Sequence, residues 1–347
     1  MISYILILLC FTSVTCKKKH YRSSSKVNEN YKISMVSSEQ YPDKPAIFSH
    51  AESPVWDPKT NSLLFVDVHQ QNVHRLHYST GKIETKHINY GQVNVVALVA
   101  GSSRLLVAVR SSLYLLDWDV MGDKALRLLV TVDQGLPDNV INEGKADTEG
   151  RFWAGTKGPQ LDDYVYPDKA TLYSFEQASM SQPRVQLRPV SISNGLTWAL
   201  NDSILYYIDS HTKKIVSFEY DPQKGEISAG RQRLILDIEE HGYEGEPIPD
   251  GMTIDDQGDL WVAIMFAGTI LHIDPNKRTV IYAYKLPVSR TTSLQWGGPN
   301  LDELFITTGK SLTAPNEPFA GAIFTIRGTG RRGLSPNYFK FHDANEY

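Results

Sequence analysis

Cysteine is almost absent from this chain of 347 residues, which contains only Cys10 and Cys16. Downstream of these two positions there can be no disulfide framework, CxxC metal site or cysteine nucleophile. A strong charge of one sign is also lacking, since 35 basic and 39 acidic residues give a net charge of −4. Because the chain has no excess of positive charge for binding nucleic acid, we expect no nucleic-acid partner. The HExxH and GxSxG signatures of zinc proteases and serine hydrolases are missing as well.

A strongly apolar run opens the chain, over residues 2–11, and is too short to span a bilayer comfortably. Val14 and Cys16 then stand at the −3 and −1 positions of a plausible cleavage site. We predict a signal peptide over residues 1–16, a flexible basic linker over 17–30, and secretion without a membrane anchor. A buried first strand and a lipid-modified Cys16 are the alternatives. In a secreted chain the sequon at Asn201 predicts glycosylation.

Helical periodicity is nearly absent, and short apolar and aromatic runs alternate with turns rich in Gly, Asn and Asp, which is typical of strands and hairpins. Six copies of a strand–turn–strand unit recur at a period of about 48 residues, which indicates propeller blades or a solenoid. Four strands and their turns fill such a period, whereas a solenoid usually has shorter coils or helices. We therefore predict an all-β, six-bladed β-propeller over residues 31–347. The strong copies start at 52, 142, 194 and 250, and the weaker copies cover 95–109 and 293–308.

An oxygen-bearing side chain heads each of the four strong copies: when the copies are aligned on their turns, Glu52, Asn142, Asn194 and Asp250 coincide. Because innermost strands line the channel of a propeller, these side chains should converge on its axis. Two carboxylates and two amides there would be costly without a counter-charge, and Ca²⁺ accepts such oxygens with tolerant geometry. We predict an axial site for one divalent cation, Ca²⁺ first, with Zn²⁺, Mn²⁺ and Mg²⁺ left open. The alternative is a set of turn residues that bond to backbone.

Five motifs give the chain a family resemblance: ESPVW at 52–56, NEGKAD at 142–147, SNGL at 193–196, PDGMTID at 249–255 and GDLWVA at 258–263. Over residues 31–340 the sequence resembles the regucalcin (senescence-marker, gluconolactonase) family and is similar to the luciferin-regenerating enzymes within it. The resemblance implies a six-bladed propeller with one divalent metal ion. It also implies that Glu52, Asn194 and Asp250 are metal ligands, and that Asn142 ligates the metal or lies beside it.

Two positions depart from the sugar-lactone members of that family. Val140 stands where they have an arginine that contacts substrate, and Gln160 stands where they have a glutamate. Asn142 is retained from their substrate-contacting set. From Val140 and Gln160 we expect a less charged pocket, which favours a more apolar lactone, ester or related electrophile over a sugar lactone.

Metal-assisted hydrolysis of a small-molecule lactone or ester, by a secreted monomer, is the function that these residues favour. The cation would polarise a carbonyl and lower the pKa of water. Because Ca²⁺ is a weak Lewis acid, a carboxylate should assist, and Asp250 is the predicted catalytic base or nucleophile. Glu52 would anchor the metal. A secreted propeller that binds Ca²⁺ or a small ligand without turnover is the alternative, and a protein-interaction propeller of the WD type predicts no metal requirement.

Overall fold

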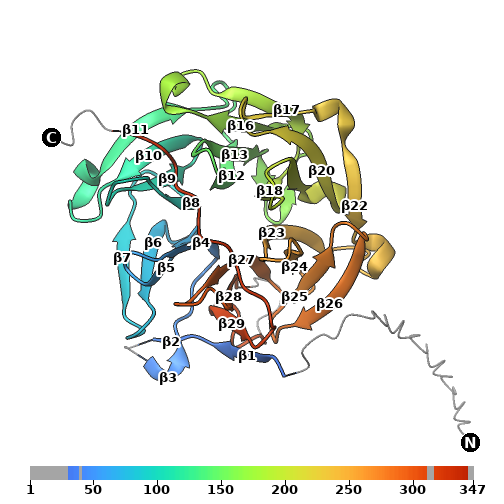
Figure 1. Ribbon diagram of the computed structural model, residues 1–347. Helices are drawn as coiled ribbons and strands as arrows, with labels where there is room; N and C mark the ends of the chain where they lie inside the picture. The colour runs from blue at the N-terminus through green and yellow to red at the C-terminus, as the bar shows by residue number, and fades with distance from the viewer. Residues whose placement is uncertain (1–29, 39–40, 311–315, 343–347) are drawn as a thin grey trace, which may run out of the picture.

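The computed structural model describes residues 30–38, 41–310 and 316–342, and it confirms the predicted six-bladed propeller. Figure 1 looks onto the ring, with the blades arranged around a common centre. The predicted signal peptide, Cys10, Cys16 and all but the last residue of the predicted linker lie outside the described residues.

Each of five blades is formed by antiparallel strands from one continuous stretch of the chain. The first two blades comprise β4 (Ala51–Asp57), β5 (Ser62–Asp67), β6 (Asn72–His77) and β7 (Ile83–His87), then β8 (Val93–Leu98), β9 (Leu105–Val109), β10 (Ser112–Leu116) and β11 (Leu126–Thr131). The third comprises β12 (Val140–Ala146), β13 (Phe152–Lys157), β16 (Ala170–Phe175) and β17 (Arg184–Val190). The fourth comprises β18 (Ser193–Trp198), β19 (Ile204–Asp209), β20 (Lys214–Asp221) and β22 (Arg233–Asp237), with β21 (Glu226–Ile227) beside β20. The fifth comprises β23 (Ile248–Ile254), β24 (Leu260–Met265), β25 (Thr269–Asp274) and β26 (Thr279–Lys285).

The sixth blade closes the ring with strands from both ends of the chain. It comprises β27 (Thr291–Gly297), β28 (Glu303–Thr308), β29 (Phe324–Arg327) and β1 (Lys32–Met35). The register runs from Lys32 opposite Arg327 to Met35 opposite Phe324. Because this pairing joins segments almost a whole chain apart, it fixes the circular order of the blades.

The remaining regular segments are short. They are the strand pairs β2 (Ser37–Ser38) with β3 (Tyr41–Pro45) and β14 (Gln160–Leu161) with β15 (Tyr164–Val165), and the 3₁₀ turns η1 (Gly122–Ala125), η2 (Gln177–Ser179), η3 (Ser210–Thr212), η4 (Ala229–Arg231) and η5 (Glu239–His241). Among the described residues, no helical segment has the length and apolar character needed to cross a bilayer.

A buried aspartate stabilises the turn of the repeat in two of the blades. Asp147 accepts hydrogen bonds from the Arg151 backbone and from the Trp153 indole, at 2.9 and 3.1 Å. Asp255 likewise accepts from the Trp261 indole at 3.0 Å. Aromatic residues of neighbouring blades pack together: Trp261 on β24 and Trp296 on β27 meet edge to face with centroids 5.2 Å apart. The residues of the repeat therefore form the turns of the blades and also pack in the core between them.

Candidate active site

Breaks in strand register place the predicted ligands. Each inner strand has a register irregularity, and Asn142, Asn194 and Asp250 fall inside such a break, while Glu52 is the last paired residue before one. A bulge interrupts the ladder and re-aims a side chain. All four side chains line one cavity of about 340 Å³ on the propeller axis. The structure thus brings the four sequence-predicted residues together, from the blades of β4, β12, β18 and β23.

Buried carboxylates dominate the floor of this cavity. Glu52 and Asp250 are 8% and 5% exposed. Burial raises the pKa of Glu52 well above its usual range, and the charges of Asp250 and Glu143 raise it further, although the Ser53 backbone N–H donates to its Oε2 at 2.5 Å. Burial, followed by the charge of Glu143, also raises the pKa of Asp250. The floor therefore disfavours ionised carboxylates unless a cation compensates them.

Hydrogen bonds across three blades hold the two predicted amides. The Asn142 amide nitrogen donates to the backbone oxygen of Ser193 at 3.0 Å and to the Asn194 side-chain oxygen at 3.3 Å. The Asn194 amide nitrogen donates to Ser210 at 2.8 Å, and the Ser210 hydroxyl donates to the Pro249 carbonyl at 2.7 Å. Because both nitrogens are committed in this way, the side-chain oxygens of the amides are set in fixed orientations.

Asn94, on β8, is a site residue that the sequence reasoning missed. It falls inside the register break between Val93 and Val95, as three of the four heads do in their own strands, whereas the weaker copy predicted from the sequence begins at residue 95. Its amide nitrogen donates to the Ile141 carbonyl at 2.7 Å, whereas its buried Oδ1 has no hydrogen-bond partner within the described residues. An unpaired buried acceptor beside two carboxylates fits a site for a hard cation, because such ions bind several oxygen ligands.

Basic side chains occupy another part of the cavity wall. Lys157, Arg290, His50 and His69 all line it, and the two imidazole centroids are 5.1 Å apart. Burial lowers the pKa of His50 to about 3, with the charges of His69, Lys157 and Arg290 acting in the same direction. Burial also lowers the pKa of His69. His50 is therefore neutral near pH 7. Arg290 forms a salt bridge with Asp163, and no sequence motif had pointed to it.

The cavity wall as a whole carries positive charge, because Lys157 and Arg290 line it. Val140 is 8% exposed and is not among the residues that line the cavity in the described part of the chain. Gln160 does line the cavity, at its exposed edge on β14, where its side-chain oxygen accepts a hydrogen bond from the Lys157 ammonium at 2.8 Å. Asn201, the predicted glycosylation site, is exposed in the turn between β18 and β19.

A second acidic group, Asp255, Asp259 and His272, also has metal-ligand composition, with candidate atoms within 4.8 Å of one another. The Arg331 guanidinium already pairs with this group: it bonds to Asp259 at 2.9 Å and approaches Asp255 at 3.7 Å. His272 stacks on Trp261, with centroids 4.2 Å apart. We assign it to the packing of the fifth blade, and the axial residues remain the better candidate metal centre.

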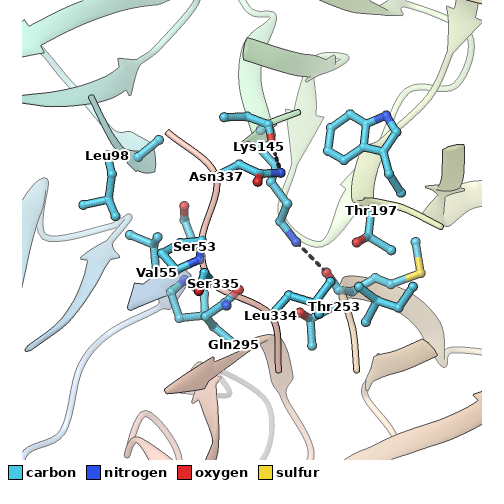
Figure 2. A pocket seen from close by; sticks show the side chains of 18 of the residues that line it. Ser53, Val55, Leu98, Lys145, Thr197, Thr253, Gln295, Leu334, Ser335 and Asn337 are labelled. Carbon is cyan, nitrogen blue, oxygen red and sulfur yellow. Dashed lines mark hydrogen bonds between the residues drawn. The ribbon is translucent and has the colours of Figure 1, made fainter. Parts of the chain in front are cut away.

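Residues slightly further along the same inner strands line a separate cavity of about 200 Å³, shown in Figure 2. There the Lys145 ammonium donates to the Met252 carbonyl at 3.0 Å. The C-terminal segment, residues 334–337, forms part of the lining, and Asn337 donates to the Ala146 carbonyl at 3.1 Å. Glu143, which follows Asn142 directly, lines this cavity rather than the axial one and is 7% exposed.

Comparison with known proteins agrees with this geometry. Residues 50–310 match the family described as the SMP-30/Gluconolactonase/LRE-like region. The chain belongs to this family. Regucalcin of Xenopus laevis is 34% identical over 323 residues, which are 89% of this chain and 98% of that protein. A solved luciferin-regenerating enzyme superposes with a TM-score of 0.80 at 28% identity, covering 90% of this chain and all of that one.

A further SMP-30/gluconolactonase relative shares the fold at lower identity. The regucalcin of Agrobacterium tumefaciens, described as a calcium-binding protein, has a TM-score of 0.75 at 20% identity and covers 85% of this chain and 95% of its own. Membership of the family confirms the resemblance that the five motifs predicted.

Proposed function

We propose that this chain is a secreted, metal-dependent hydrolase of the SMP-30/gluconolactonase type that acts on a small lactone or ester. The observation that carries the proposal is the convergence of Glu52, Asn194, Asp250 and Asn142 on one cavity of about 340 Å³. Glu52, Asn194 and Asp250 would hold the cation, with Asn142 and Asn94 beside it. A divalent ion bound there, Ca²⁺ first, would supply Lewis-acid polarisation of the substrate carbonyl.

Asp250 carries the proton transfer in this proposal. Its carboxylate would accept the proton of the attacking water at Oδ and return it to the leaving oxygen. A general base must be ionised to accept a proton, and a cation bound beside Asp250 would keep this carboxylate ionised. The bond from Asn142 to Asn194 keeps the neighbouring amides in place. Glu52, held by its bond from the Ser53 N–H, serves as the anchoring ligand.

A panel of lactones and aryl esters, assayed with added Ca²⁺ and with excess chelator, tests the proposal. We expect hydrolysis of at least one panel member, loss of that activity in chelator, and recovery when Ca²⁺ is restored. If the folded chain binds Ca²⁺ and hydrolyses no member of the panel, the alternative of a binding propeller without turnover replaces the hydrolase.

Secretion is the second part of the proposal and rests on the apolar run over residues 2–11. The exposed position of Asn201 in its hairpin turn supports glycan attachment in a secretory compartment. The Asn201 side-chain oxygen accepts from the Ser203 hydroxyl at 2.8 Å, so the two sequon residues already contact each other.

A further inference from the structure

We propose that the axial cavity selects a lactone or ester that carries a carboxylate, and that Lys157 and Arg290 bind this carboxylate. The inference rests on the proposed function, because it names the substrate class of the same site. Lys157 and Arg290 line the cavity that also holds Glu52 and Asp250. The same cavity is lined by His50 and His69, whose ring centroids are 5.1 Å apart.

Lys157 lacks an anionic partner of its own. Its ammonium donates to the neutral Gln160 oxygen at 2.8 Å, and no salt bridge to it is found within the described residues. Lys157 lines the same cavity as Asp250 and Glu52, which are the buried carboxylates of its wall. A metal ion bound by those two carboxylates would neutralise their negative charge. The desolvated Lys157 ammonium would then need another anion beside it. A carboxylate on the substrate supplies it.

Arg290 has binding capacity left after its salt bridge with Asp163. Its side chain is 6% exposed, its guanidinium lies over the Phe266 ring at 4.9 Å, and its buried Nε has no hydrogen-bond partner within the described residues. A guanidinium presents several donors in a fixed plane that matches a carboxylate. Asp163 accepts from one terminal nitrogen of the guanidinium, and the buried Nε remains for a further acceptor.

Strand register places Lys157 directly opposite Val140. Val140 stands at the position where the resemblance places an arginine, and Lys157 is its direct cross-strand partner on β13. Directly opposed residues project from the same face of a sheet, with Cβ atoms about 4.5–5.5 Å apart. Lys157 can therefore place a cation close to where the arginine would lie, which replaces the expected apolar preference with an anionic one.

The test uses a matched substrate pair: γ-butyrolactone with a ring carboxylate, and the same lactone with a carboxamide in its place. On the full mature chain with Ca²⁺, we expect kcat/KM to be on the order of 10-fold to 100-fold higher for the acid, the range for a hydrogen bond to a charged group. Lys157→Met should remove most of this ratio by lowering the acid value alone. Lys145→Met is the matched control, since it removes a lysine of the other cavity, and it should preserve the ratio.

Calorimetry provides a readout independent of turnover, using the ring-opened dicarboxylate and Ca²⁺ as separate probes. Lys157→Met should weaken dicarboxylate binding at least tenfold and should tighten Ca²⁺ binding, because a repelling cation is gone. Equal or better hydrolysis of the carboxamide by wild type would overturn the inference and leave the hydrolase standing. If neither lactone is hydrolysed but the dicarboxylate binds through Lys157, the anion site stands and the proposed hydrolysis fails. Absence of both hydrolysis and binding overturns both.

Discussion

Removal of the metal should make stability of this propeller depend on pH in a direction opposite to that of most acidic clusters. Burial raises the pKa of both Glu52 and Asp250. The folded metal-free chain therefore holds more protons than the unfolded chain, and its stability falls as pH rises from about 4, the usual carboxylate value, through the raised values. Each unit by which a folded-state pKa is raised costs about 1.4 kcal/mol once the pH lies above it.

Bound metal should reverse this loss, because the cation requires both carboxylates in their ionised form. At a hundredfold excess over Kd, a ligand that binds only the folded state stabilises it by about 2.7 kcal/mol. For a chain of this size, about 2 °C per kcal/mol gives a shift in Tm of about 5 °C. We expect this shift to be largest at high pH and to shrink as the carboxylates become protonated.

Differential scanning calorimetry of the chelator-treated chain, with and without Ca²⁺, measures both effects across a pH series from about 5 to 8. Glu52→Gln is the control, because it keeps the size of the side chain and removes one buried charge. This variant should flatten the pH dependence of the metal-free chain and lose most of the metal-induced shift. A metal-free Tm that stays constant or rises across the series, or a metal-induced shift that does not change with pH, would refute the reasoning.

The other predictions concern catalysis, targeting and the fifth blade. Asp250→Asn keeps a ligand oxygen but cannot accept a proton, so turnover should fall by about 10² or more. The Ca²⁺ affinity of this variant, measured by calorimetry, should fall only modestly. If the variant turns over substrate as fast as wild type, Asp250 is not the base. Expression in a eukaryotic secretory host should yield a chain that lacks the first 16 or so residues and carries glycan on Asn201, whereas intact mass showing a full-length, unmodified chain would contradict both. Arg331→Ala should remove the guanidinium that bonds to Asp259 and approaches Asp255, with His272 remaining beside both carboxylates. We expect a loss of about 1–3 kcal/mol in urea titration, and a change below about 0.5 kcal/mol would show that Arg331 is not structural.

The six-fold repeat and its four polar heads could be predicted from the sequence alone. Strand runs such as residues 63–66, 206–208 and 260–264 appear in β5, β19 and β24, because alternation of apolar strands with Gly, Asn and Asp turns is a local property. The heads were visible because each stands at a fixed distance from its turn. Equivalent positions in a closed ring must meet at the axis, so Glu52, Asn142, Asn194 and Asp250 could be placed together without coordinates.

The composition of the cavity wall and the closure of the ring could not be predicted from the sequence, because both depend on contacts between distant segments. Lys157 and Arg290 belong to no repeat position, and they meet His50 only after the ring has closed through the pairing of β1 with β29. The weak repeat did not identify Asn94, which the structure places in the cavity lining with an unpaired Oδ1. Protonation behaviour is likewise a product of folding, since desolvation and opposing charges act only between groups that the fold has buried together. Local sequence specifies strands and turns, whereas the charge around a ligand depends on contacts between residues more than a hundred positions apart.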